Sequence, residues 1–169
     1  MNENKITQNG CSSGNEKCNC AVKERCGEKV LCEEEVREIY RNLMAGKDSV
    51  ETLRPMSEDS AFREVLLRQD QAYSEFCSRV ESYANDHDYK LKDLSVFAKG
   101  MMHMSASINA LTDKSPSKLA SIMLQGINMG VISITKIVNK LHDDGCGCPL
   151  AEDMLEMLKH NAEEMKRFL

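Results

Sequence analysis

Apolar residues recur every three or four positions along most of the chain, which is the spacing of amphipathic helices. The first predicted helix begins at Glu33 and ends before Pro55, and Gly46 weakens its middle. Its apolar stripe consists of Val36, Ile39, Tyr40, Leu43, Val50 and Leu53. A second helix is expected to begin near Asp59 or Ser60, because both side chains can cap a helix N-terminus.

The second helix ends at the polar run 85–88, and three more helices are expected after it. The third is shorter and spans residues 94–111. Ser115 and Pro116 supply an N-cap and a first-turn proline for a long fourth helix, and Pro149 begins the last helix. The stripe of the second helix is Phe62, Val65, Leu66, Gln69, Tyr73, Phe76, Val80 and Tyr83, and that of the third is Leu94, Phe97, Met101, Met104, Ile108 and Leu111. The long helix is expected to bury Leu119, Met123, Ile127, Gly130, Ile134, Ile137 and Leu141, and the last helix Ala151, Leu155, Leu158, Ala162, Met165 and Leu169.

The composition agrees with an all-α protein. The chain has 169 residues, only three Pro and nine Gly, and no Trp, which suits a single helical domain. Residues 1–32 differ from the rest, because they hold five cysteines among small and polar residues and show almost no apolar periodicity. We therefore expect two parts: a disordered, cysteine-rich N-terminal tail over 1–32 and a helical bundle over 33–169.

Charge and hydropathy argue against several classes of protein. A net charge of −5 does not favour nucleic-acid binding. The longest uncharged run, residues 119–135, is shorter than the roughly 20 apolar residues of a spanning helix, so we interpret it as a core helix and expect no membrane role. The polar N-terminus leads into no apolar run, so we expect a cytoplasmic protein without a secretory signal.

The chain from Glu33 to Leu169 resembles a bacterial ferritin-like family that is known as domain of unknown function 2383. The similarity lies in the segments Leu43-Met44-Ala45-Gly46-Lys47-Asp48-Ser49, Phe97-Ala98-Lys99-Gly100-Met101-Met102, Leu124-Gln125-Gly126-Ile127-Asn128-Met129-Gly130 and His160-Asn161-Ala162-Glu163-Glu164-Met165. The resemblance implies an up-down four-helix bundle with an extra helix in the long crossover connection. The family's activity is unsettled, so the resemblance implies a fold and little function.

A ferritin-type di-metal centre is not predicted by the residues themselves. Such a centre needs inward carboxylates and two Glu-x-x-His motifs, yet no Glu-x-x-His occurs and no Asp or Glu lies between Lys114 and His142. The nearest substitute is His160-x-x-Glu163, which we place at the solvated edge of the bundle. By fold analogy its partners would be Glu51, Asp70 and Glu75.

The cysteines are the stronger chemical signal. Cys18 and Cys20 form one Cys-x-Cys pair and Cys146 and Cys148 form another, and four thiolates can satisfy zinc or another thiophilic metal. In a ferritin-like topology the loop before the last helix lies where the first helix begins, which would bring the two pairs near each other. The alternatives are free thiols, or crosslinks formed on oxidation. Cys77 is expected to lie in the core.

Two other motifs have simpler interpretations. The run Met101-Met102-His103-Met104 could suggest copper, but Met101 and Met104 share the core face of a helix. Gly126-x-x-x-Gly130 allows another backbone to approach closely, either the crossover helix or a second subunit.

The sequence thus predicts a non-enzymatic, ferritin-like bundle with a binding or structural role. Its cysteines would hold a metal or crosslink the chain into a homo-oligomer or other assembly. The alternatives are a ferritin-like metalloprotein that handles iron or peroxide with an atypical ligand set, and a thiol redox protein with one cysteine of depressed pKa.

Overall fold

The computed structural model describes residues 30–91, 111–143, 145 and 147–169. Within them lie α1 (Glu33–Leu53), the short 3-10 helix η1 (Arg54–Met56), α2 (Ser60–Asp86), α4 (Pro116–Asp143) and α5 (Pro149–Lys166). The predicted all-α class and the four long helices are confirmed. Residues 1–29 of the predicted tail and all but the last residue of the predicted crossover helix lie outside the described residues, so the ferritin-like assignment stays a prediction. At the end of the predicted tail, Leu31 and Cys32 are buried.

Local chemistry explains where the helices begin and end. Asp59 caps α2, since its Oδ1 accepts a hydrogen bond of 2.7 Å from the backbone N–H of Phe62. Proline occupies the first position of both α4 and α5, where its missing N–H costs nothing. α1 continues through Gly46 and passes into η1 at Arg54.

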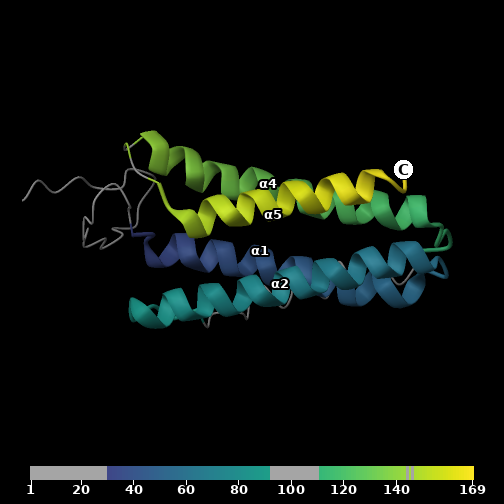
Figure 1. Ribbon diagram of the computed structural model, residues 1–169, viewed down its shortest axis with the longest axis horizontal. Coiled ribbons are helices and arrows are strands. Elements are labelled where there is room, and N and C mark those ends of the chain that lie inside the picture. The colour runs from purple at the N-terminus through teal and green to yellow at the C-terminus, as the bar shows by residue number, and fades with distance from the viewer. Residues whose placement is uncertain (1–29, 92–110, 144, 146) are drawn as a thin grey trace, which may run out of the picture.

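The four helices form two antiparallel hairpins that pack against each other. One hairpin is α1 and α2 and the other is α4 and α5, and the contacts between the hairpins run from α1 to α4 and from α2 to α5. Figure 1 shows that α2 and α4 run in the same direction, so the end of α2 and the start of α4 lie at opposite ends of the bundle. As a result, α1 and α5 begin at the same end.

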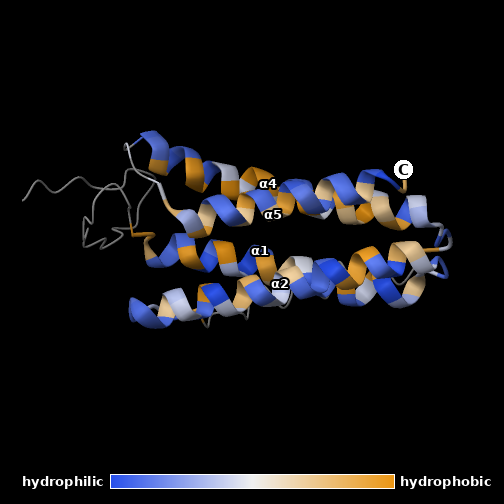
Figure 2. Cartoon of the chain, in the orientation of Figure 1, coloured by the Kyte–Doolittle hydropathy of each residue, from blue (hydrophilic) through white to orange (hydrophobic). Residues whose placement is uncertain are grey.

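The core is apolar and follows the predicted stripes. Figure 2 shows apolar and polar residues alternating along every helix, and all seven stripe residues predicted for the long helix are buried. Two details differ from the prediction. Tyr40 and Tyr83 are only partly buried, because their hydroxyls reach polar partners at the edge of the core. Leu169 is 63% exposed, because α5 ends at Lys166 and leaves the last residue beyond the helix.

One of the described helices has the length and composition of a membrane-spanning segment. This helix is α4, and about a third of its most apolar stretch (33%) is buried inside the bundle. Because the core helix of a soluble protein meets the same criterion, the observation is weak evidence for a membrane role.

Candidate functional site

The chain is held firmly just before α1 begins. The hydroxyl of Tyr83 accepts a hydrogen bond of 2.9 Å from the N–H of Leu31, and the hydroxyl of Tyr89 donates one of 3.0 Å to the Leu31 carbonyl. The imidazole of His87 stacks on both tyrosine rings, with centroids 4.2 and 5.6 Å away. Both backbone groups of Leu31 are therefore paired, and the point where residues 1–29 join the bundle is defined.

Cys32 is the N-cap residue of α1 and is 8% exposed. Its backbone N–H donates a hydrogen bond of 2.9 Å to Oε2 of Glu35, which is the reciprocal half of a capping box. The other oxygen of Glu35 accepts from Nζ of Lys140 on α4 at 2.6 Å. Burial disfavours the charged carboxylate, but these hydrogen bonds and the lysine charge outweigh it and hold the pKa of Glu35 below its ordinary value.

Cys148 occupies the equivalent position at the start of α5 and is 2% exposed. Its carbonyl accepts hydrogen bonds from the N–H groups of Ala151 and Glu152, at 3.0 and 3.1 Å. Nearby, Nε2 of His142 lies 3.1 Å from Oε1 of Glu152. Cys148 therefore lies at the N-terminal, positive end of the α5 dipole.

The predicted four-cysteine site is only partly within the described residues. Of its members Cys148 is described, whereas Cys18, Cys20 and Cys146 lie outside the described part of the chain. The topology brings Cys148 to the same end as Cys32, since α5 and α1 begin there (Figure 1). The donor set suits a thiophilic metal, because soft thiolates prefer zinc and similar ions.

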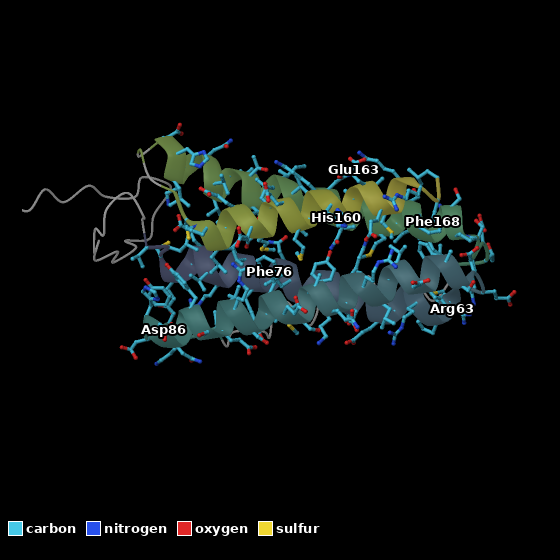
Figure 3. The ribbon with its side chains drawn as sticks, in the orientation of Figure 1. Arg63, Phe76, Asp86, His160, Glu163 and Phe168 are labelled. Atoms are coloured by element: carbon cyan, nitrogen blue, oxygen red, sulfur yellow. The ribbon has the colours of Figure 1, made fainter. Side chains whose placement is uncertain are left out.

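The residues considered for a di-metal centre do not converge. His160 and Glu163 project from α5 (Figure 3), and both are exposed, as predicted for the edge of the bundle. Glu51 and Glu75 are exposed as well, and Asp70 is only partly buried. Among the described residues, no three His, Cys, Asp or Glu side chains gather in a way that could hold a metal ion.

The interior instead contains a polar layer between α2 and α5. Gln69, Asn161 and Glu164 are 1%, 2% and 6% exposed. Nε2 of Gln69 donates to the backbone carbonyl of Asn161 at 3.2 Å and to Oε2 of Glu164 at 3.4 Å, and Arg68 binds Oε1 of Glu164 at 3.0 Å. Burial raises the pKa of Tyr73 to about 12, although its hydrogen bond with Asn161 opposes the rise. The layer holds one carboxylate with its own cation, so it does not have the charge of a di-metal site.

Sequence reasoning placed Gln69 on the core stripe but missed Asn161 and Glu164. The helical spacing could have predicted their burial, because Asn161 follows the core residue Leu158 by three positions and Glu164 follows Asn161 by three. The stripe predicted for the last helix contained apolar residues only, whereas α2 supplies polar partners for Asn161 and Glu164 from across the bundle.

Cys77, the third cysteine among the described residues, lies in the core as predicted. Cys77 is a free cysteine in the core, and burial raises the pKa of its thiol above the ordinary value. The run Met101-Met102-His103-Met104 lies outside the described residues.

Comparison of the chain with protein-family models, curated proteins and solved structures gave no match in any of the three. The resemblance to the ferritin-like family therefore stays a prediction.

Proposed function

We propose that this protein is a non-enzymatic helical scaffold whose cysteines bind a thiophilic metal, such as zinc, at the end of the bundle where α1 and α5 begin. The observation that carries the proposal is that α1 and α5 begin at the same end of the bundle. Cys32 is the N-cap residue of α1, and Cys148 is the N-cap residue of α5. The segment that contains Cys18 and Cys20 joins α1 at the same end as the loop that contains Cys146.

In this proposal Cys18, Cys20, Cys146 and Cys148 are the ligands, and the bundle supplies a rigid base. The hydrogen bonds to Leu31 and the capping box at Cys32 hold the chain in place where the tail joins α1. Pro149 sets the start of α5. A bound metal would crosslink the tail to this loop and stabilise both segments.

Elemental analysis of protein purified without oxygen tests the proposal. The wild-type chain is expected to hold metal in a simple ratio to protein, and replacement of Cys18 and Cys20 by Ser is expected to remove it. These two residues precede the helices, so their loss should leave the bundle folded. Cys11→Ser and Cys77→Ser are the matched controls and should retain the metal.

Two outcomes would contradict this function. A metal-free wild-type protein would exclude a metal-binding role. Iron that remains after all four proposed ligands are changed to Ser would instead support the alternative, a ferritin-like metalloprotein with an atypical ligand set. If the same cysteines instead crosslink chains to each other, the protein would form a dimer that dissociates in reductant, and that result would favour the crosslinking alternative over metal binding.

A further inference from the structure

The outer face of α4 carries exposed apolar side chains and no charge over most of its length. Four large apolar side chains are exposed among the described residues, and two of them, Met129 at 68% and Ile132 at 59%, lie three positions apart on α4. No charged residue occurs between Lys118 and Lys136. Within the described part of the chain α4 packs mainly against α5 and α1. Exposed apolar side chains that gather on one face are typical of an interaction surface.

The residues along the centre of this face have the spacing of a seam between paired helices. They follow one another at alternating intervals of four and three positions, which keeps them in one row along the helix. All of them are exposed except Ile122, which is partly buried. This row, the α4 seam, consists of Lys118, Ile122, Gln125, Met129, Ile132 and Lys136.

The α4 seam is symmetric about position 127. Ile122 and Ile132 lie equally far from this position on either side, and so do Gln125 and Met129, which are both uncharged and unbranched. In an antiparallel pair related by a two-fold axis at position 127, each seam residue meets the residue at the mirrored position of the other copy. The apolar ends of the uncharged stretch therefore face each other, so the seam is complementary to a second copy of itself.

We propose that the outer face of α4 is a homodimer interface, in which two copies pack antiparallel along the α4 seam. Ile122 of each copy contacts Ile132 of the second copy, and Gln125 contacts Met129 of the second copy. The antiparallel arrangement also places the positive end of each α4 dipole beside the negative end of the other. This inference depends neither on the cysteines nor on a bound metal.

The charges at the ends of the seam limit the strength of the dimer. Lys118 of each copy faces Lys136 of the second copy, at the solvated rim of a seam that is about 27 Å long. Salt screens this repulsion, so the dimer should become tighter as the ionic strength rises. One helix-on-helix contact of this length is small for a stable interface, and we expect a Kd on the order of 10 μM.

Analytical ultracentrifugation of the full-length protein in reductant tests the proposal, because reductant removes any dimer that disulfides hold. The wild type is expected to dimerise. Met129→Asp should raise the Kd by about 100-fold or more, because it places a carboxylate between two apolar rows. Leu67→Asp is the matched control, since Leu67 is 43% exposed on α2, and it should leave the Kd unchanged.

Lys118→Glu tests the antiparallel register through a gain in affinity, which a misfolded variant cannot produce. The new carboxylate would face Lys136 of the second copy at both ends of the seam, so the Kd should fall by about tenfold. Lys159→Glu makes the same change of charge at an exposed position of α5 and should not lower the Kd.

Three results would count against the interface. A wild type that stays monomeric at about 100 μM would overturn the proposal, and so would a dimer that Met129→Asp does not weaken. A dimer that Lys118→Glu does not tighten would overturn the antiparallel register.

Discussion

Gly46 and Tyr73 show how one residue can depend on a partner from another helix. A Cβ at Gly46 would collide with the ring of Tyr73 on α2, with the phenol oxygen only 2.9 Å away. We expect Gly46→Ala to lower the free energy of unfolding by about 1–2 kcal/mol, because overpacking outweighs the gain in helix propensity. Chemical denaturation measures this change.

Gly126→Ala is the matched control for that substitution. Gly126 also lies inside a helix, but a Cβ there meets no atom within 4 Å. The helix propensity of alanine should therefore raise the free energy of unfolding by about 0.5–1 kcal/mol. If both alanines stabilised the protein equally, Tyr73 would not restrict position 46 to glycine.

At the scale of the elements, α2 and α5 are joined by two ion pairs that differ in burial. Arg68 binds Glu164, whose side chain is 8% exposed, whereas Arg79 binds Asp153, which is 51% exposed. Arg68→Met would leave a buried carboxylate without its cation, so we expect a loss of about 2 kcal/mol in stability. Arg79→Met should cost less than about 1 kcal/mol. Thermal unfolding of both variants compares them, and equal losses would mean that the burial of Glu164 does not matter.

At the scale of the whole molecule, the pair of Glu35 and Lys140 ties the two hairpins together. The pKa of Glu35 is lowered in the folded state, so its contribution to stability is present above the unfolded pKa and disappears as the pH falls through the folded pKa. We expect Glu35→Gln to lose about 1 kcal/mol at pH 7. The difference from the wild type should shrink below about pH 4.3, the ordinary carboxyl pKa.

Denaturant unfolding at several pH values measures the effect of Glu35→Gln. Glu163→Gln is the control, because Glu163 is exposed and pairs with Lys166 of its own helix, at 2.5 Å. A loss at Glu35 that stayed constant down to acidic pH would show that its charge does not join the hairpins.

The sequence by itself determined the four described long helices and where they begin and end, because these features depend on neighbours along the chain. The apolar stripes set which face of each helix is buried, and Asp59, Pro116 and Pro149 mark helix starts through local hydrogen bonding and fixed backbone angles. The burial of Cys77 followed from its position beside the stripe of α2 in the same way.

Only the tertiary structure decided which residues meet across the bundle. The polar layer of Gln69, Asn161 and Glu164, the need for glycine opposite Tyr73 and the link from Glu35 to Lys140 all join residues far apart in sequence. Periodicity cannot predict them, because it describes one helix at a time and says nothing of the helix beside it. For the candidate site, the cysteine spacing suggested a donor set, and the topology implied by the resemblance placed the loop before the last helix where the first helix begins. In the structure α1 and α5, with Cys32 and Cys148 at their N-caps, begin at the same end.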